Sequence, residues 1–373
     1  MVIIASRLSE LRERVGREVD AGLLPSCQFA VGLEGEVVAH EAFGDATNDT
    51  RYVIYSATKA FIAGAIYQLI DEGLLDVSRP VTEYFPEFGA NAKDAITVEQ
   101  VMTHTSGFPR APMPPAIWGD HDARVARMAA WRLNWEPGSQ FEYHPTSAHW
   151  VLSEIIQRLD GRDYRASIRR RINEPLGLTR FALGVEPDDQ HDIAALRLTG
   201  EDPTPDELER VFGIRTYDRG EVTPEALTEF NRTDALAAGL PGGGGVSDAA
   251  DVVRYYQALL HDPGELWNLE SLVDVTRRIR CTMPDPFLGH PSNRSLGLIV
   301  AGDDGRANLR GMGHNVSPET FGHNGAAGQI AWADPRSGLS FCYLTNGIDR
   351  NFLREHRRTS GIASRAALLT TPY

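Results

Sequence analysis

The sequence predicts an α+β fold, in which an antiparallel sheet flanked by terminal helices is interrupted by an inserted all-helical section. Three observations point to this fold class. Strand-like segments separated by turn residues lie near both ends, helical periodicity dominates the middle, and the chain opens on an amphipathic stretch. Because strands from the two ends are expected to form one sheet, the helical middle is best explained as an insertion.

The first elements are expected to be a helix and a hairpin. Over residues 5–22, apolar side chains from Leu8 to Val19 recur at spacings of three and four, which is typical of a surface helix. Residues 27–33 and 37–43 are expected to be strands, and the Glu-Gly pair between them is a turn sequence. This part of the chain therefore supplies one helix and two paired strands.

A second hairpin is expected near the C-terminus, where residues 329–333 and 339–344 flank the turn sequence Asp-Pro-Arg-Ser-Gly. Between the hairpins, the apolar pattern predicts helices over 147–159 and 247–260. Two further helix starts carry capping boxes, which pair Thr97 with Gln100 and Thr204 with Glu207.

The charge balance excludes two classes of partner. Lys+Arg 37 against Asp+Glu 51 gives a net charge of −14. That is the wrong sign for neutralising nucleic-acid phosphates or for lying on an anionic membrane surface. No stretch approaches the ~18 apolar residues of a transmembrane helix. The expected partner is a small molecule, without nucleic acid or membrane.

The cysteines do not form a disulfide framework. Cys27, Cys281 and Cys342 are odd in number and lack metal-site spacing, so we expect small buried residues in a reducing compartment. The N-terminal sequence becomes a charged helix before any signal-peptide core appears. These features predict a cytoplasmic location.

Lysine is rare in this chain. Lys59 and Lys93 are the only two among 37 basic residues, and the others are arginine. A guanidinium stays charged, whereas a buried amine can lose its proton. Each lysine is therefore a candidate for a role that arginine cannot fill.

The most informative segment is residues 52–66, where a strand-like start gives way to a helix at Ser56. There the serine hydroxyl and the unpaired N–H groups of the first turn can face a substrate. Lys59 shares that helix face, and a lysine held against a helix N-terminus and apolar neighbours can accept the serine proton. The structural alternative is a helix-capping serine beside a surface lysine.

A second segment, residues 131–150, places Tyr143 after a Glu-Pro-Gly turn and just before a helix. A phenol there can act as a base or proton relay if a neighbouring cation favours its ionised form. The alternative is a tyrosine packed between domains with its hydroxyl hydrogen-bonded.

A third segment, residues 321–335, has small residues after His323, which indicate a strand that a ligand can approach closely. An exposed N–H group of this strand, together with the Ser56 N–H, would form an oxyanion hole. A simple turn at His-Asn-Gly is the structural alternative.

The order Ser-x-x-Lys, tyrosine motif, His-x-Gly resembles the penicillin-recognising serine hydrolase superfamily. More narrowly, it is similar to the class C β-lactamase-like branch that includes family VIII carboxylesterases. The supporting segments run along most of the chain and are Met-Thr-His-Thr-Ser-Gly-Phe-Pro (102–109), Glu-Pro-Gly-x-x-Phe-x-Tyr (136–143) and Phe-Gly-His-Asn-Gly-Ala-Ala-Gly (321–328).

The resemblance implies a β-lactamase/transpeptidase-like architecture. Residues 1–75 and 291–373 would form the sheet domain, and residues 76–290 the helical domain, with the active site in the cleft between them. The boundary near 290 comes from the family rather than from the pattern of this chain.

Carried over residue by residue, the resemblance implies a nucleophile at Ser56 with proton transfer shared by Lys59 and Tyr143. The backbone N–H groups of Ser56 and Ala326 would be the oxyanion donors. Neither a metal nor an organic cofactor is implied.

His323 and Gly325 would contact the substrate opposite the nucleophile, and His323 stands where many relatives have lysine. His104 is expected to be buried and structural. Residues 116–135, with Trp118 and Trp131, are an alternative source of an acyl-pocket wall.

One position departs from the family pattern. Pro145 stands where the tyrosine motif usually has asparagine, and proline has no side-chain amide to hold a substrate amide or the catalytic lysine. Ester hydrolysis depends less on that contact. His144, Thr146 and Ser147 are the residues that would compensate.

These observations predict a serine carboxylesterase that acts on small esters through an acyl-enzyme. The alternatives on the same scaffold are an amidase or D-aminopeptidase, a weak β-lactamase and an acyltransferase. An alternative of another class is a serine-acylated binding or sensor protein without turnover. The physiological substrate and the oligomeric state are left open.

Overall fold

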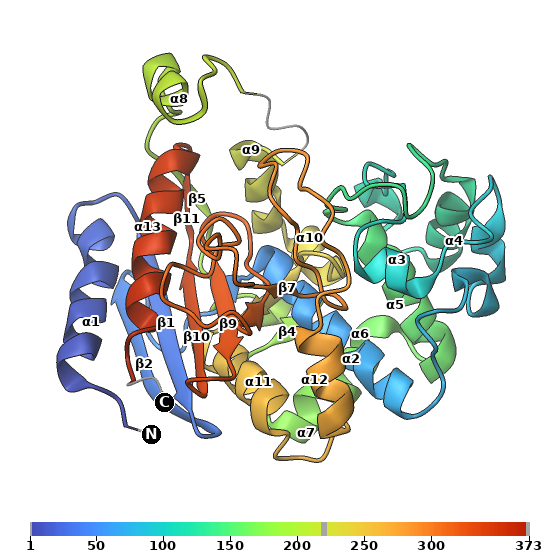
Figure 1. Cartoon of the computed structure of the whole chain (residues 1–373), viewed down its shortest axis with the longest axis horizontal. Coiled ribbons are helices and arrows are strands. Elements are labelled where there is room, and N and C mark those ends of the chain that lie inside the picture. Colours follow the sequence, from blue (N-terminus) through green and yellow to red (C-terminus); the bar gives the residue numbers. More distant parts are fainter. Residues whose placement is uncertain (1, 218–221, 371–373) are drawn as a thin grey trace.

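The computed structural model describes residues 2–217 and 222–370, and Figure 1 shows the arrangement of its elements. Its α-helices are α1 (Ala5–Asp20), α2 (Thr58–Asp71), α3 (Val98–Met102), α4 (His121–Ala130), α5 (Ser147–Asp160), α6 (Tyr164–Ile168), α7 (Glu174–Leu176), α8 (Pro205–Phe212), α9 (Pro224–Thr228), α10 (Thr233–Ala238), α11 (Ala249–His261), α12 (Leu269–Arg277) and α13 (Phe352–Ala366). Its strands are β1 (Ser26–Leu33), β2 (Glu36–Gly44), β3 (Tyr52–Val53), β4 (Ala182–Leu183), β5 (Arg197–Thr199), β6 (Gly245–Ser247), β7 (Ile299–Val300), β8 (Phe321–Gly322), β9 (Ile330–Asp334), β10 (Leu339–Thr345) and β11 (Gly347–Asp349).

The main sheet is built from the two ends of the chain. Its strand order is β2-β1-β10-β9-β8-β7, and all neighbouring strands are antiparallel. The first hairpin joins the last through β1 and β10, where Ala30 lies opposite Cys342. The sheet from both ends, which the sequence predicts, is confirmed.

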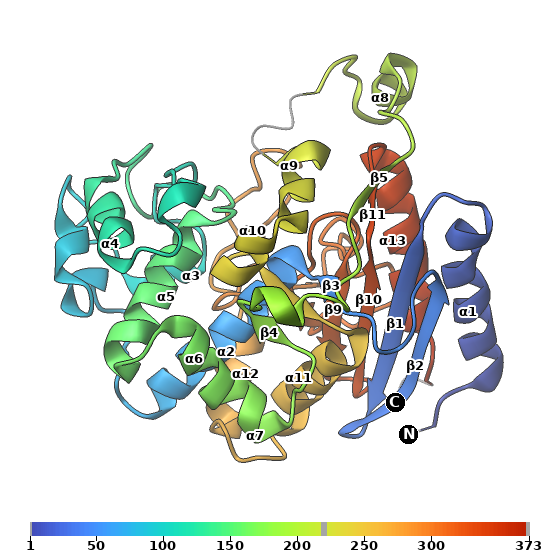
Figure 2. The same cartoon turned by 180° about the vertical axis from the view of Figure 1, so that it is seen from behind.

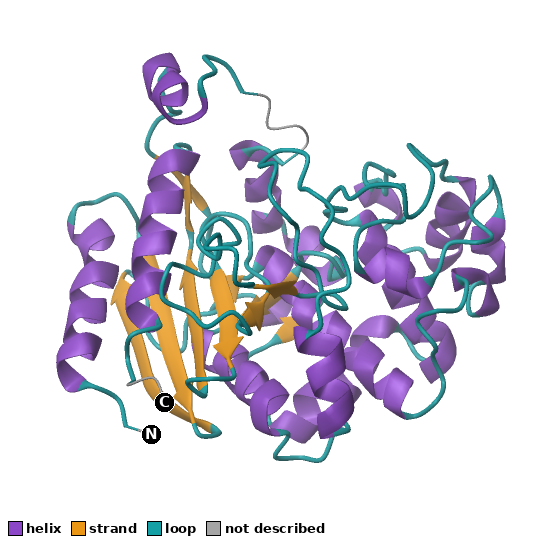
Figure 3. Cartoon of the chain, viewed as in Figure 1, coloured by secondary structure: helices purple, strands orange, loops and turns teal. Residues whose placement is uncertain are grey.

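Terminal helices cover one face of this sheet. Figures 1 and 3 show α1 and α13 side by side on it. The buried layer between helices and sheet includes Leu11, Val15, Phe29, Phe341 and Ile362. The backbone N–H of Ile4 donates to Leu369 O at 2.8 Å, which ties the two ends of the described chain together.

The other face of the sheet is covered by α11, which packs against β1, β2, β9 and β10. Beyond α11 lies the helical part of the molecule, which Figure 2 shows from behind. Its central element is α2, whose residues Thr58 to Leu69 are all buried. A helix that is buried on all sides is expected in a core. Other parts of the protein therefore surround α2.

Short strands also occur between the two hairpins. Strands β3, β6 and β4 form a small antiparallel sheet, and β11 pairs in parallel with β5. The sheet of β3, β6 and β4 joins the start of α2 to the middle of the chain. The division into residues 1–75 with 291–373 and 76–290 stays a prediction.

Most local predictions hold. Both hairpins are present, and the helices expected at 5–22, 147–159 and 247–260 correspond to α1, α5 and α11. Both predicted capping boxes form, at the starts of α3 and α8. The three cysteines are free and buried, as expected. Among the described helices, none is both long and apolar enough to cross a membrane.

Candidate active site

Ser56 lies in a single helical turn, Tyr55–Ala57, that joins β3 to α2. Tyr55, just before it, has φ 44°, in the left-handed region that non-glycine residues rarely adopt. Such backbone strain persists only where surrounding contacts hold it. Here the Tyr55 hydroxyl donates to Leu227 O at 3.2 Å and Ile54 N donates to Gly245 O at 2.9 Å. Both contacts fix the turn that presents Ser56.

The structure brings Lys59 and Tyr143 to the Ser56 hydroxyl. Lys59 Nζ lies 3.2 Å and Tyr143 Oη 2.9 Å from Ser56 Oγ. Lys59 reaches it from the first turn of α2, whereas Tyr143 comes from the loop before α5. Both distances lie within reach for moving the serine proton.

Lys59 is fully buried, and its amine is surrounded by acceptors. Nζ donates to Pro145 O at 2.7 Å and to Gly242 O at 2.5 Å, in addition to its contact with Ser56. Burial lowers the pKa of Lys59, the charge of Arg294 lowers it further, and Tyr143 acts in the opposite direction. A buried amine with a lowered pKa is suited to accepting a proton.

These contacts show what holds Lys59 from position 145, where the resemblance would place an asparagine. The lysine is held by the backbone carbonyl of Pro145 rather than by a side-chain amide. The second carbonyl belongs to Gly242, in the glycine run at 241–245 that the sequence marks as a place of close backbone approach. A Cβ on Gly242 would lie 2.9 Å from Pro145 O, so only glycine fits there without displacement.

The second lysine, Lys93, is also surrounded by backbone carbonyls, but it does not border the cavity at Ser56. Its buried amine donates to three backbone carbonyls, those of Ala90, Ala129 and Trp131. Burial lowers the pKa of Lys93 to about 8. Three carbonyls around one nitrogen suit the compact ammonium, whereas a planar guanidinium does not fit them.

Two basic side chains lie close to the ring of Tyr143. Lys59 Nζ is 5.2 Å and Arg294 Cζ 5.3 Å from the centre of the Tyr143 ring. Arg294 was not singled out from the sequence, because nothing in its local pattern distinguishes it from the other arginines. It is buried, and no described carboxylate forms an ion pair with it; its Nη1 contacts His323 Nε2 at 3.4 Å.

His323 lies beside this arginine as a neutral side chain. Burial lowers the pKa of His323 well below its usual value, and the charges of Arg294 and Lys59 lower it further. Its Nδ1 lies 2.9 Å from Asn324 O, which assigns the proton to that nitrogen and leaves Nε2 to accept from Arg294. The positive charge on this side of the site is therefore carried by Arg294.

The strand expected after His323 does not form at that place. β8 stops at Gly322, and residues 325–329 form a tight turn closed by a bridge between Gly325 and Gln329. Ala327 and Gly328 both have positive φ, so the small residues build a turn instead of a strand. The turn alternative placed the turn at His-Asn-Gly (323–325), whereas the structure has it at 325–329, and the role of this segment in the site stays a prediction.

The turn leaves two backbone donors beside the nucleophile. Ser56 and Ala326 both border the pocket, and within the described chain neither N–H donates to a backbone or side-chain acceptor. Gly325 borders the same pocket, but its own N–H donates to Gln329 O at 3.1 Å. Gly325 can therefore offer close approach, whereas Ser56 and Ala326 can offer donors.

Of the three residues expected to compensate for Pro145, only Thr146 borders the pocket. Ser147 Oγ donates to Phe108 O at 2.9 Å, away from the nucleophile. His144 is also buried and faces Ser106 and Phe108 instead. His104 is buried as expected, and its ring lies with its edge against Tyr143 at 4.8 Å.

The buried ring of His144 leads us to expect a marked loss of folding stability in acid. Its Nε2 accepts from Phe108 N at 3.2 Å and its Nδ1 donates to Glu142 O at 2.6 Å, so a second proton on Nε2 would displace the Phe108 N–H and would have Ser106 Oγ, at 3.1 Å, as its acceptor. Burial lowers the pKa of His144 from 6.5 to about 4. The unfolded state therefore binds more protons in this window. Stability is complete above pH ~6.5 and falls toward pH ~4, by about 3 kcal/mol from this residue.

Urea unfolding between pH 7.5 and 4 measures this loss. In His144→Gln the slope of unfolding free energy against pH is expected to fall by about 1 kcal/mol per pH unit. His191→Gln, at an exposed histidine, is the matched control and should keep the wild-type slope. An unchanged slope in His144→Gln would show that His144 is not the group responsible.

A cavity of about 490 Å³ opens onto Ser56 and Tyr143. Its apolar side comes from residues between 222 and 240, whereas Trp118 and Trp131 do not border it. Their indole N–H groups donate instead to Met113 O and Pro112 O, both at 2.9 Å. Residues 116–135, the alternative source of a wall, therefore do not border this cavity.

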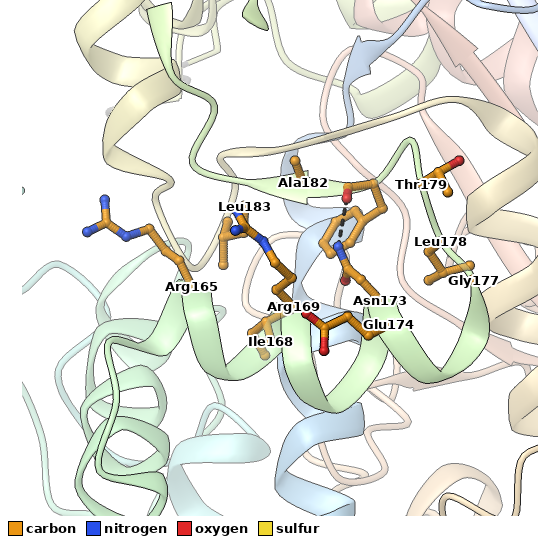
Figure 4. A pocket seen from close by; sticks show the side chains of 11 residues that line it. Arg165, Ile168, Arg169, Asn173, Glu174, Gly177, Leu178, Thr179, Ala182 and Leu183 are labelled. Atoms are coloured by element: carbon orange, nitrogen blue, oxygen red, sulfur yellow. Dashed lines mark hydrogen bonds between the residues drawn. The ribbon is translucent and has the colours of Figure 1, made fainter.

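A second cavity, of about 400 Å³, lies elsewhere and is shown in Figure 4. It lies between the helical turns at 165–174 and the segment at 177–183, and Asn173 Nδ2 donates across it to Phe181 O at 2.8 Å. None of the residues around Ser56 lines it. In the described residues, no group of three or more His, Cys, Asp or Glu side chains is arranged to hold a metal.

Comparisons with known proteins agree with this fold. The Beta-lactamase family model matches residues 11–363. The "Esterase/beta-lactamase LipL" of Mycobacterium tuberculosis is 31% identical over 319 residues, 80% of this chain and 70% of that protein. A penicillin-binding protein homologue from Caulobacter crescentus has 27% identity and a TM-score of 0.80, with 99% of each chain covered. A family VIII carboxylesterase has 25% identity and a TM-score of 0.79, with 98% of this chain and 99% of that chain covered.

Proposed function

The chain belongs to the beta-lactamase family, and from that premise we propose that it is a serine carboxylesterase that works through an acyl-enzyme on Ser56. The observation that carries this proposal is the pair of contacts at Ser56 Oγ, 3.2 Å from Lys59 Nζ and 2.9 Å from Tyr143 Oη. A serine hydroxyl becomes a nucleophile when a neighbouring base takes its proton.

In the proposed reaction, Ser56 Oγ attacks the ester carbonyl carbon while its proton passes to the Lys59–Tyr143 pair. The N–H groups of Ser56 and Ala326 stabilise the oxyanion. When the tetrahedral intermediate collapses, the carbon–oxygen bond to the alcohol breaks and the pair returns the proton to the leaving oxygen. Water then adds to the acyl-enzyme by the same route, and the carboxylic acid is released.

Esters are proposed over amides because of the tyrosine loop. Pro145 offers no side-chain amide to a substrate N–H, and its backbone carbonyl is already bonded to Lys59. An amide substrate would therefore leave its own polar group without a partner, which costs binding energy in a desolvated site. The name of the Mycobacterium tuberculosis relative, an esterase/beta-lactamase, supports ester chemistry and keeps amide hydrolysis as the alternative.

A matched pair of substrates tests this choice. We expect p-nitrophenyl butyrate to be hydrolysed far faster than butyryl p-nitroanilide, by a factor larger than the ratio for hydroxide ion with the same two compounds. Comparing with hydroxide removes the intrinsic difference between the two leaving groups. An enzymatic ratio below the hydroxide ratio would instead identify an amidase.

The non-turnover alternative has its own signature. A serine-acylated binding protein would release one equivalent of p-nitrophenol and then stop, with a stable butyryl mass on the Ser56 peptide. A carboxylesterase shows continued release, and the acyl mass declines once the substrate is exhausted. Intact-protein mass spectrometry during the same assay therefore separates the two classes.

A further inference from the structure

The cavity at Ser56 is divided into an apolar and a polar side. Most of its apolar lining comes from Tyr55, Ala226, Leu227, Phe230 and Leu240, which we call the apolar side. Val222, Ile299 and Ala326 add further apolar surface. Apart from Tyr55, the residues of the apolar side lie on α9, on the following turn Glu229–Asn231, and just after α10. One short stretch of chain therefore supplies the apolar wall.

Contacts behind the wall hold it in place. The ring of Phe230 stands edge-on to that of Tyr55, with 5.6 Å between centres and an interplanar angle of 89°. Next to it, Asn231 accepts from Leu196 N at 2.7 Å and donates to Leu196 O at 2.9 Å. Leu227 and Phe230 pack on a small core cluster that includes Tyr55. Phe230 is therefore anchored on both sides.

A second group of residues that line the cavity is polar. It contains Asp285, Arg294, His323 and Asn324. Asp285 and Arg294 carry formal charges, and within the described residues they do not form an ion pair with each other. An apolar group bound there would cover these polar atoms without bonding them, which is unfavourable. The two sides therefore suit different parts of one substrate.

We propose that the acyl group of the substrate lies against the apolar wall and that Phe230 ends the space available to it. The enzyme then favours esters of short apolar carboxylic acids, with the alcohol directed toward the polar side. This inference rests on the proposed ester hydrolysis at Ser56. It adds the substrate class and assigns Phe230 as the residue that determines specificity.

The acyl-enzyme explains why the wall holds the acyl group rather than the alcohol. The acyl group stays bonded to Ser56 until water arrives, so contacts with Tyr55 and Phe230 act through both half-reactions. The alcohol leaves after the first half-reaction, and polar surroundings ease its return to water. Each methylene buried on the wall contributes about fourfold to kcat/KM, and one that meets Phe230 contributes nothing.

The test is kcat/KM for p-nitrophenyl esters from acetate to decanoate. In the wild type we expect kcat/KM to rise with chain length up to a short-chain length and to gain nothing from further methylenes. In Phe230→Ala this limit should move by at least two carbons, with the octanoate-to-butyrate ratio raised about tenfold or more. Phe230→Leu, which keeps a well-packed side chain, should lie between the two.

Phe212→Ala is the matched control. Phe212 lies at the end of α8, outside the cavity, and its ring packs against those of Phe287 and Phe352. Figures 1 and 2 show α8 at the edge of the molecule. Phe212→Ala should keep the wild-type chain-length profile. A second series, butyrate esters of alcohols of increasing length, should respond little to Phe230→Ala. A shift in the alcohol series with an unchanged acyl series would overturn the assignment.

Alkyl fluorophosphonates of graded chain length make the test independent of turnover. They phosphonylate an activated serine with loss of fluoride, and the rate of mass increase on Ser56 reports how well each chain fits. A rate that depends on chain length and shifts in Phe230→Ala supports the wall even if no ester is hydrolysed, a result that would refute only the esterase proposal. Labelling rates that are the same in both proteins would overturn the role of Phe230.

Discussion

Replacing Ser56 by alanine is expected to lower kcat/KM for p-nitrophenyl butyrate by about 10⁴-fold or more, because no other group can form the acyl bond. The residual rate would come from the oxyanion donors and from binding alone. Only one oxygen is removed, and the Lys59 amine keeps its two carbonyl partners, so the thermal unfolding midpoint should change little. Steady-state kinetics and a thermal melt of the same preparations provide both readouts.

Ser147→Ala is the control for this substitution. Ser147 is buried and close to Tyr143 in the sequence, but its hydroxyl donates to Phe108 O. Its loss should cost some stability and leave kcat/KM within a few-fold of wild type. If Ser56→Ala kept more than about a tenth of wild-type activity, the nucleophile would have to be another residue.

Replacing Lys59 by arginine is expected to lower kcat/KM by about 10³-fold, although the charge at neutral pH is the same or higher. A guanidinium does not give up its proton under these conditions, so it cannot accept one from Ser56. It also offers a planar fork where the protein provides acceptors for a single nitrogen, at Pro145 O, Gly242 O and Ser56 Oγ.

The same substitution at Lys93 distinguishes the loss of proton transfer from the loss of stability that a poorly fitting guanidinium causes. Lys93→Arg places a guanidinium among three carbonyls as well, so it should destabilise the protein about as much as Lys59→Arg. Because Lys93 does not border the cavity, its kcat/KM should stay near the wild-type value. Equal loss of activity in both variants would mean that Lys59 serves only as a structural cation.

The sequence was informative where the deciding contacts are local. The hairpins follow from turn residues between strand-forming segments, and the capping boxes at Thr97 and Thr204 involve residues three apart. The pairing of Ser56 with Lys59 is of the same kind, since one helical turn brings them together. In each case the backbone geometry of a few neighbouring residues is sufficient.

The sequence was less informative where distant segments meet. Gly242 and Pro145 both hold Lys59, but no local pattern links positions so far apart in the chain. Arg294 is similarly one arginine among many until folding places it beside Tyr143. Residues 116–135, with Trp118 and Trp131, are only an alternative for the acyl-pocket wall in the sequence, and aromatic content alone does not show which side chains reach the cavity.

The burial of both lysines has a consequence for the chemistry of the surface. With Lys59 and Lys93 sealed among backbone carbonyls, no lysine amine is exposed to solvent. An activated acyl donor in solution therefore finds no lysine on the folded protein to form a stable amide with. Amine-directed labels and cross-linkers should leave the lysines of the native protein unmodified, and reaction at Lys93 would serve as a sensitive signal that the fold has opened.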